Sequence, residues 1–259
     1  MRNEDLCSRL IDAIETLEKN SKRYREAAEK GELWAKSPAD FPVPSISDKE
    51  FEWLYTQKLV AQRSAGRKYY DQLLASALLG RCPYCNHNRV KTIDHFLPKK
   101  PFATLAIDPW NLVPCCQECN FVMLDSVATG IEDAGFHPYH EVIVDSWLSV
   151  EIRNEDGAAA KFRPRCPADW SSHLKSRVRT TFRKLGLAEM YASAAGVAIA
   201  ELHHQVSLLH RSGGDASVRE HLKEAADSIE AVGPNSWRAV LYRGLAHDDW
   251  YCSGGFSAG

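Results

Sequence analysis

Four short segments near the middle of the chain decide how the sequence is interpreted. They are residues 82–85 (CPYC), 92–99 (TIDHFLPK), 108–112 (DPWNL) and 116–120 (CQECN). Each of the two CxxC segments places two thiolates on one tight turn, and a tetrahedral zinc ion takes four such ligands. The sequence therefore predicts one structural zinc, bound by Cys82, Cys85, Cys116 and Cys119.

Other interpretations of these cysteines are weaker. Cys115 could replace Cys116 as a ligand, but its spacing to Cys119 departs from the two-residue knuckle. The CPYC segment resembles the redox motif of glutaredoxins, in which a helix begins at the first cysteine. Here a helical pattern precedes the segment, and a second CxxC follows it. A zinc deaminase is excluded, because no His-x-Glu or Cys-x-Glu precedes a Pro-Cys-x-x-Cys.

The segments between the two knuckles offer ligands for a second metal. Asp94 and His95 end a short apolar run, and strand alternation points their side chains to opposite faces unless the backbone bends. Asn120 follows a zinc-binding cysteine at the start of an apparent helix, which would make it a rigid oxygen ligand. Mg²⁺ accepts few protein oxygens and completes its shell with water and phosphate. One carboxylate and one amide therefore fit a catalytic Mg²⁺ or Mn²⁺.

Taken together, these segments resemble the HNH endonucleases of the His-Me finger superfamily. The resemblance covers about forty of the 259 residues, and the order of its elements matches the zinc-containing branch of that family. It implies a ββα-metal finger between about residues 82 and 124. It also implies hydrolysis of phosphodiester bonds in nucleic acid, with DNA expected and RNA left open.

The resemblance assigns a role to each matching residue. His95 would be the general base that deprotonates the attacking water, and its ordinary pKa near 6.5 would leave it mostly neutral at pH 7. Asp94 and Asn120 would bind the catalytic metal, which neutralises charge on the phosphate and the leaving oxygen. Asn111 would brace the loop that orients His95.

One position departs from the family pattern. Met123 stands where the family often has a lysine, three residues after the last asparagine. The contact with phosphate would then come from Lys91, Lys99 and Lys100, or from the basic run that begins at Lys161. A solvated surface is an equally good interpretation of that run.

Composition sets wider limits. The chain is 44% hydrophobic and 25% charged, which is ordinary for a soluble globular protein. Its formal charge of −2 says nothing about nucleic acid, because only the distribution of charge matters for phosphate binding. No apolar run approaches the roughly 20 residues that span a bilayer, and the N-terminal residues do not resemble a signal peptide. We therefore expect a cytoplasmic protein with reduced thiols.

Hydrophobic periodicity predicts an α+β protein that is mostly α-helical. Helices are expected over residues 4–30, 47–79 (with an irregularity at Gly66), 174–185, 188–209, 218–231 and 236–245, with Gly213 and Gly214 separating two of them. Short strands are expected over 142–144 and 148–152. The predicted regions are an N-terminal helical region (1–80), the finger with the following strands (81–165) and a C-terminal helical region (166–259).

The helical flanks are too extensive to serve only as support for the finger, so we expect them to dock a partner or shape a nucleic-acid channel. Stand-alone HNH proteins of this size resemble the nuclease component of two-component antiphage systems such as Septu, which an ATPase partner controls. A catalytically silent zinc-knuckle module that binds nucleic acid or protein is the alternative, although it need not have kept Asp94, His95 and Asn120. A restriction or homing-type endonuclease ranks lower, because no DNA-reading module is recognisable. For the segment 137–140 (HPYH), a structural role in a turn is favoured over a substrate or metal contact.

Overall fold

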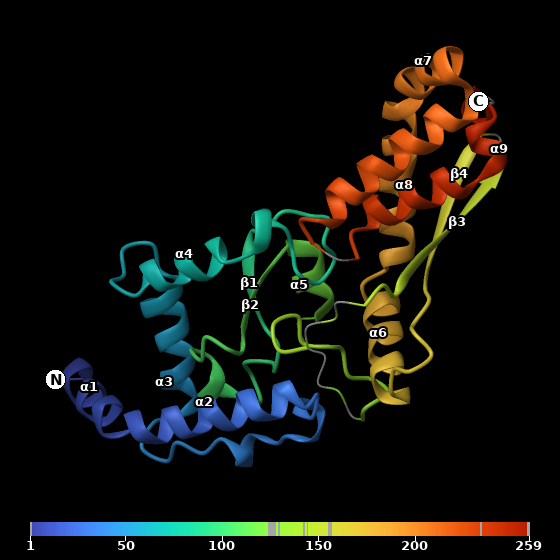
Figure 1. The fold of residues 1–259 in the computed structure, drawn as a ribbon. Coiled ribbons are helices and arrows are strands. Elements are labelled where there is room, and N and C mark those ends of the chain that lie inside the picture. The colour runs from blue at the N-terminus through green and yellow to red at the C-terminus, as the bar shows by residue number, and fades with distance from the viewer. Residues whose placement is uncertain are drawn as a thin grey trace. The chain divides into compact units, whose positions relative to one another are not determined.

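The computed structural model describes residues 2–123, 128, 130–141, 143, 145–154, 157–233 and 235–257. Over these residues the protein is mixed α+β and mostly helical, and its strands form two separate two-stranded antiparallel sheets. The chain divides into two compact units, Met1–Val142 and Ile143–Gly259 (Figure 1).

The first unit begins with two helices instead of the single helix expected over 4–30. Helix α1 (Arg2–Asp12) and helix α2 (Ile14–Glu29) are separated at Ala13. Ala13 is buried together with Leu6 and Phe51, so the bend lets both helices contribute to the same core. Two short 3₁₀ helices, η1 (Leu33–Ala35) and η2 (Pro38–Asp40), follow.

The second expected helix is also divided. Helix α3 (Asp48–Trp53) is preceded by Ser47, which forms a reciprocal capping box with Glu50. It continues as the π-helix η3 (Leu54–Val60), and the helical hydrogen bonding resumes in α4 (Arg67–Ala75). A π-helix is rare and often occurs at a functional site. Here it contains Tyr55, whose contact with the candidate site is described below.

The finger follows the 3₁₀ turn η4 (Leu78–Gly80). Strand β1 (Thr92–His95) pairs antiparallel with β2 (Leu112–Cys115), in a register that places Asp94 opposite Val113 and His95 opposite Leu112. The connection between the strands contains the 3₁₀ helix η5 (Ala103–Leu105), and helix α5 (Gln117–Met123) follows β2. The local order is therefore strand, strand, helix, with one CxxC segment before β1 and the other at the start of α5.

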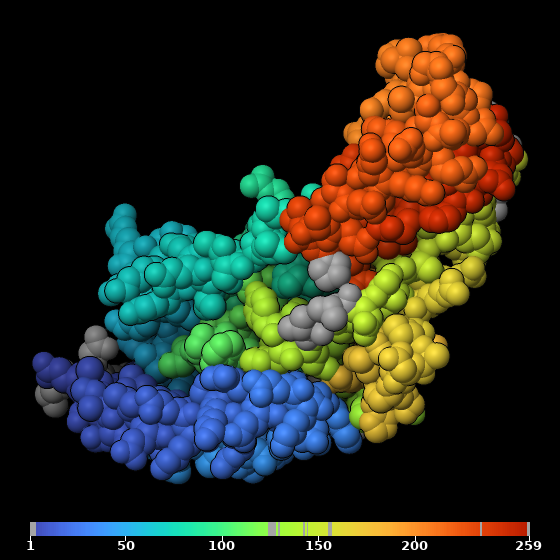
Figure 2. Space-filling view, viewed as in Figure 1, coloured from blue at the N-terminus to red at the C-terminus, as the bar shows by residue number. Residues whose placement is uncertain are grey.

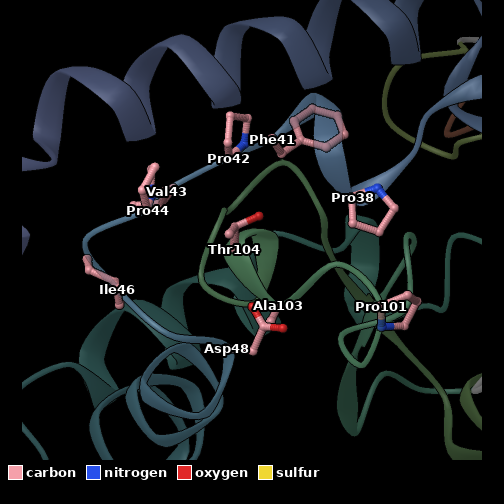
Figure 3. Close-up of a pocket in the computed structure, with 10 residues that line it drawn as sticks. All are labelled: Pro38, Phe41, Pro42, Val43, Pro44, Ile46, Asp48, Pro101, Ala103 and Thr104. Atoms are coloured by element: carbon pink, nitrogen blue, oxygen red, sulfur yellow. The ribbon is translucent and has the colours of Figure 1, made fainter.

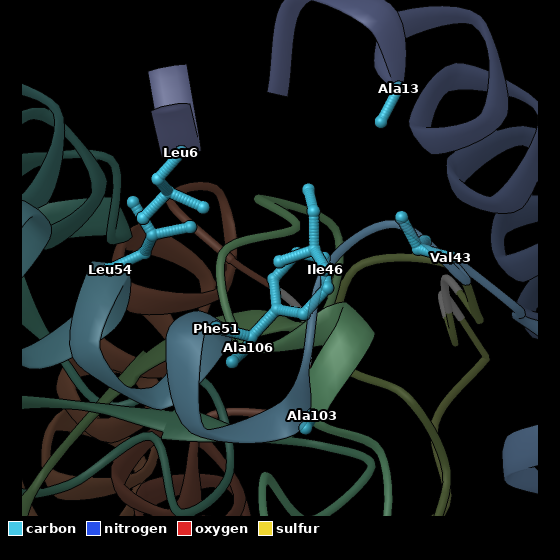
Figure 4. Close-up of a cluster of buried hydrophobic side chains, with 8 residues drawn as sticks. All are labelled: Leu6, Ala13, Val43, Ile46, Phe51, Leu54, Ala103 and Ala106. Carbon is cyan, nitrogen blue, oxygen red and sulfur yellow. The ribbon is translucent and has the colours of Figure 1, made fainter. Parts of the chain in front are cut away.

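A buried apolar cluster joins the N-terminal helices to the finger. Its members come from α1, the bend after it, the 43–46 loop, α3 and the η5 segment, and Figure 4 shows them facing one another: Leu6, Ala13, Val43, Ile46, Phe51, Leu54, Ala103 and Ala106. A second cluster packs Tyr24 of α2 and Phe41 against Leu97 and Phe102 of the finger. These shared cores explain why residues before and after 80 form one unit, whereas the sequence-based boundary separated them.

The second unit contains a β-hairpin and five helical segments. Their bounds are β3 (Leu148–Asn154), β4 (Ala158–Pro164), α6 (Ser172–Lys184), α7 (Leu187–Glu230), α8 (Trp237–His247), α9 (Asp249–Cys252) and the 3₁₀ turn η6 (Gly255–Ser257). The expected strand over 142–144 falls mostly on Val142 and Val144, which lie outside the described residues.

The hairpin belongs with the C-terminal helices, although the sequence-based region 81–165 grouped it with the finger. Its inner face packs on α7 and α8. The approach to α8 is so close that a Cβ atom at Gly244 would lie 2.3 Å from Cγ1 of Val150. Phe162 of β4 also packs edge-on against Tyr191 of α7, with ring centroids 5.5 Å apart. Burial of this apolar face thus decides which unit contains the hairpin.

Helix α7 is interrupted where the sequence predicted a break between two helices. Gly214 has φ of 64° and ψ of −162°, a conformation that residues with a Cβ atom rarely adopt, and the chain turns there (Figure 1). No single helix within the described ranges is long and apolar enough to cross a membrane. Only as a pair, bent by 62° at the break between them, do α6 and α7 have the required length and composition.

Candidate functional site

Four cysteine sulfurs converge between the two knuckles. The Sγ atoms of Cys82, Cys85, Cys116 and Cys119 lie within 4.8 Å of one another, and all four residues are buried. Four sulfurs placed tetrahedrally around zinc at about 2.3 Å lie about 3.8 Å apart, so this cluster could hold one zinc ion. The second knuckle has a supporting hydrogen bond of 3.4 Å from the amide of Cys119 to Sγ of Cys116. No other cluster of three or more such side chains occurs among the described residues.

Cys115 is not part of this cluster. It is buried at the end of β2, where its carbonyl oxygen accepts a hydrogen bond of 2.9 Å from the amide of Lys91. Burial raises the pKa of its thiol above the usual range. The geometry therefore favours Cys116 as the ligand, as the two-residue spacing predicted.

Asp94 lies on β1 in a buried environment and is 3% exposed. Its Oδ2 accepts a hydrogen bond of 3.0 Å from the hydroxyl of Tyr84, a residue inside the first knuckle. Burial raises the pKa of Asp94 to about 6, and the hydrogen bond from Tyr84 opposes that shift. The carboxyl group is thus held in one orientation at a place where a negative charge is costly without a cation.

His95 is half-buried at the end of the same strand. Its Nε2 lies 3.0 Å from the carbonyl oxygen of Ala106, and its ring packs against Tyr55 with centroids 4.5 Å apart. The pKa of His95 is lowered to about 4, mainly by burial and to a smaller extent by the positive charge of Lys99, while the hydrogen bond to the Ala106 carbonyl opposes the shift. The imidazole is therefore neutral at pH 7.

Asn111 is fully buried and connects both ends of the loop between the strands. Its Oδ1 accepts a hydrogen bond of 2.7 Å from the amide of Leu97, and its Nδ2 donates to the carbonyl oxygens of Leu97 (3.0 Å) and Leu105 (3.3 Å). This network fixes the segment that carries the Ala106 carbonyl. Asn111 therefore braces the loop beside His95, and both the oxygen and the nitrogen of its side-chain amide form hydrogen bonds with backbone groups.

Asn120 lies in the first turns of α5 and is half-buried. Its backbone amide donates to the carbonyl oxygen of Cys116 at 3.0 Å, which ties it to the second knuckle. Helix α5 packs against β1, so Asn120 and Asp94 come from neighbouring elements. Among the described residues, its side-chain amide makes no hydrogen bond.

The three lysines predicted to contact phosphate do not gather at one place. Lys99 is half-buried, and its ammonium lies 5.0 Å from the ring of Tyr55, beside His95. Lys100 follows it and is exposed. Lys91 precedes β1 and therefore lies at the opposite end of the strand from His95. Lys99 is the lysine that the fold brings to the candidate active site.

Sequence reasoning missed three groups that contact the candidate catalytic residues. Tyr84 contacts Asp94, while Tyr55 and the carbonyl oxygen of Ala106 contact His95. Tyr84 could have been suspected from its place inside the CPYC segment. Nothing local in the sequence marks the other two, because they reach the site through packing of α3, η3 and η5.

The HPYH segment packs under the finger. His137 is fully buried, its Nε2 lies 3.1 Å from the hydroxyl of Tyr24, and its Nδ1 accepts a hydrogen bond of 3.2 Å from the amide of Tyr139. Its ring also packs against Phe96 and His140, with centroids 4.4 and 4.6 Å apart. The pKa of His137 is lowered to about 3, mainly by burial and to a smaller extent by the neighbouring His140. These contacts suit the structural role that the sequence favoured.

A pocket of ≈ 220 Å³ lies in the first unit, between the proline-rich 38–48 segment and the chain around Pro101 and Thr104 (Figure 3). Its walls are mostly apolar, and Asp48 is its one acidic lining residue. It contains none of the candidate catalytic or zinc-binding residues, so it is separate from the site described above.

Comparison with known proteins finds a similar sequence in a bacteriophage, Protein ea31 of Escherichia phage lambda. The two chains are 27% identical over 267 aligned positions, which cover 94% of this chain and 89% of that protein. No protein-family model matches the chain. No solved structure matches it. The similarity to a phage protein therefore extends over almost the whole chain and is not confined to the finger.

Proposed function

We propose that the protein is a metal-dependent endonuclease of the HNH type that hydrolyses phosphodiester bonds in DNA. The observation that carries the proposal is the contact between Nε2 of His95 and the carbonyl oxygen of Ala106, 3.0 Å apart. A carbonyl oxygen accepts hydrogen bonds and cannot donate them. The contact therefore favours the tautomer with its proton on Nε2.

That tautomer leaves the lone pair on Nδ1, where the ring can accept a proton. Burial keeps the pKa of His95 low, so the imidazole is neutral at pH 7 and ready to act as a base. In the proposed reaction, Nδ1 takes a proton from the water that attacks the phosphorus, and the bond to the leaving oxygen breaks. Tyr55 and Ala106 hold the ring in place during this step. Positioned general bases contribute roughly 10²–10⁴-fold to a rate.

Asp94 and Asn120 would hold the catalytic Mg²⁺ or Mn²⁺. One buried carboxylate and one amide oxygen from adjacent elements match the few protein ligands that Mg²⁺ accepts. The carboxyl of Asp94 is buried with the hydroxyl of Tyr84 as its side-chain donor, an environment that a cation would stabilise. The metal, when bound, supplies positive charge against the phosphoryl oxygens and the leaving group.

Lys99 is the cation that we assign to the scissile phosphate. It lies beside Tyr55 and His95 and would take the role of the lysine that the HNH family often has at the position of Met123. An antiphage role and control by an ATPase partner stay predictions from the resemblance, as does a cytoplasmic location.

The test is cleavage of supercoiled plasmid by the purified full-length protein in the presence of Mg²⁺ or Mn²⁺. His95→Ala should abolish nicking and linearisation, and so should omission of the divalent metal. The matched control is His204→Ala, which removes an exposed histidine from α7 and should leave cleavage unchanged. Zinc content and thermal unfolding should be measured for each variant, so that loss of cleavage is not confused with loss of the fold.

Cleavage that persists in His95→Ala would contradict the assignment of the base. A folded, zinc-loaded wild-type protein that cleaves neither plasmid nor single-stranded RNA, alone or in a lysate of its native host, would favour the silent zinc-knuckle module instead.

A further inference from the structure

Strand β4 in the second unit presents basic side chains on one face only. Ala160 and Phe162 are buried against the helices. The alternate residues Lys161 and Arg163 are exposed, and so is Arg165, which follows the end of the strand. This is the two-residue alternation of a strand with one buried face. The packing of the hairpin on α7 and α8 therefore forces these cations outward.

Helix α6 repeats the pattern with helical spacing. Val178 and Phe182 are buried, and Phe182 packs edge-on against Trp147. The apolar stripe leaves Lys175, Arg179 and Arg183 together on one side, because residues four apart lie on the same face of a helix. These three cations extend over about 12 Å of the helix axis at 1.5 Å per residue.

The two basic sets meet where the chain passes from β4 to α6. The ammonium of Lys175 donates a hydrogen bond of 2.7 Å to the carbonyl oxygen of Ala168. The charges of Arg179 and Lys175 also act on the thiol of Cys166, the neighbour of Arg165. The connecting segment thus lies along the cationic side of α6.

We call the following set of cations the basic face: Lys161, Arg165, Lys175, Arg179 and Arg183. The two elements that carry most of them, β4 and α6, lie at the surface in Figure 2 (yellow-green and yellow).

Acidic side chains neutralise little of this face. Within the described residues, no carboxylate forms an ion pair with any of its five members. Arg163 differs and is left out of the set, since it pairs with Glu151 at 3.3 Å. From residue 157 to 188 the sequence contains one acidic residue, Asp169. A cluster of like charges that the protein does not neutralise itself attracts partners of opposite charge.

We propose that the basic face binds the phosphate backbone of double-stranded nucleic acid, without reading its sequence. Three of its five cations are arginines, whose planar guanidinium groups bind phosphate in a bidentate manner. Duplex DNA carries one negative charge per about 1.7 Å of its axis, a density that matches a row of closely spaced cations. A membrane surface fits less well, because a helix that lies on a membrane needs an exposed apolar stripe and the stripe of α6 is buried.

The proposal extends the nuclease assignment by naming a surface that holds the substrate, and it is tested without cleavage. Binding of a fluorescein-labelled 30-base-pair duplex is measured by anisotropy as a function of salt, with full-length His95→Ala protein and no added divalent metal. The triple variant Arg165→Gln/Arg179→Gln/Arg183→Gln is compared with Arg211→Gln/Arg238→Gln/Arg243→Gln. The second set removes the same charge from α7 and α8 of the same unit, where Arg243 already pairs with Asp227 at 3.0 Å.

The first triple variant should bind at least 10-fold more weakly at about 0.1 M salt. The slope of log Kd against log salt should fall by about 0.9 for each phosphate that the variant no longer neutralises, that is by about 2 to 3. The control triple variant should keep the wild-type slope. If the first triple variant unfolds, Arg179→Gln alone should still lower the slope by about 1.

Wild-type affinity and slope in the first triple variant would overturn the proposal. An equal loss of affinity in both triple variants would do the same, because it would show an effect of net charge alone. Binding to phosphatidylserine vesicles through these arginines, without binding to the duplex, would replace nucleic acid by a membrane surface.

Discussion

The hydroxyl of Tyr84 donates a hydrogen bond of 3.0 Å to Oδ2 of Asp94, and the two side chains are 4% and 3% exposed. Tyr84 lies between two of the four cysteines that could hold zinc, while Asp94 is the carboxylate that we assign to the catalytic metal. The contact joins the cysteine cluster directly to the candidate active site. A zinc ion bound at the cluster would thus also orient a ligand of the second metal, through Tyr84 in the first knuckle.

Tyr84→Phe should weaken binding of the catalytic metal while zinc content stays at one per chain. Loss of one hydrogen bond to a buried carboxylate costs about 1.5–3 kcal/mol, or at least about 10-fold in affinity. The measurement is Mn²⁺ binding followed by electron paramagnetic resonance, beside the Mn²⁺ dependence of cleavage. Tyr69→Phe, which alters an exposed tyrosine of α4, is the control. Equal Mn²⁺ affinities for Tyr84→Phe and wild type would show that the contact does not position Asp94.

Cys115→Ala and Cys116→Ala should behave differently although the two residues are adjacent. Cys116→Ala removes one of four clustered sulfurs, so zinc should fall well below one per chain and the unfolding temperature should drop with it. Cys115→Ala should keep one zinc and lose only the packing of a small buried side chain. Metal analysis and thermal unfolding of both variants distinguish them. Retention of zinc by Cys116→Ala together with its loss from Cys115→Ala would reverse the ligand assignment.

Acidification should destabilise the first unit through His137. Burial lowers the pKa of this residue to about 3, from an ordinary value of 6.5, so the unfolded chain takes up a proton that the folded protein excludes. The contribution of His137 to stability is complete above pH 6.5 and is lost as the pH falls toward 3. The slope within this window reaches about 1.4 kcal/mol per pH unit.

Denaturant unfolding of the wild type and of His137→Asn, measured from pH 7.5 to 4.5, tests this expectation. The variant cannot titrate and should show a shallower dependence on pH. Loss of zinc at low pH affects both proteins and cancels in the comparison. His204→Asn, which alters an exposed histidine of α7, is the control for the substitution itself. An identical slope in His137→Asn would assign the acid sensitivity to other groups.

Asn111→Ala should lower the free energy of unfolding by about 2–4 kcal/mol, because three buried hydrogen bonds to the backbone are removed. Asn20→Ala provides a graded comparison, since the Asn20 side chain makes one such bond, of 3.1 Å, to the carbonyl oxygen of Pro42. Its cost should be about 1 kcal/mol. Cleavage should fall far more in Asn111→Ala, which releases the loop carrying the Ala106 carbonyl. Equal costs for the two variants would argue against Asn111 as the brace of that loop.

Much of the candidate site could be predicted because its residues are close in the sequence. A CxxC turn brings its two sulfurs together through local backbone geometry, so the zinc ligands follow from spacing. The break at Gly214 is equally local, and the sequence predicted it at Gly213 and Gly214. The break at Ala13 and the π-helix after α3 were not predicted, because periodicity describes the buried face of a helix and not the bends that fit it to a core.

The sequence by itself thus determined the four cysteines of the cluster, the Asp-His pair at the end of a strand and the cations of α6. These depend on spacing over a few residues or on the period of a helix or strand, whereas the strand–strand–helix order of the finger was expected from the family resemblance alone. Only the tertiary structure decided that Tyr55 and the carbonyl oxygen of Ala106 hold His95, and that His137 packs beneath the finger against Tyr24. It also decided that the β3–β4 hairpin belongs with the C-terminal helices. These contacts join segments from 11 to 113 residues apart, and such contacts form only when burial of apolar surface brings distant segments together.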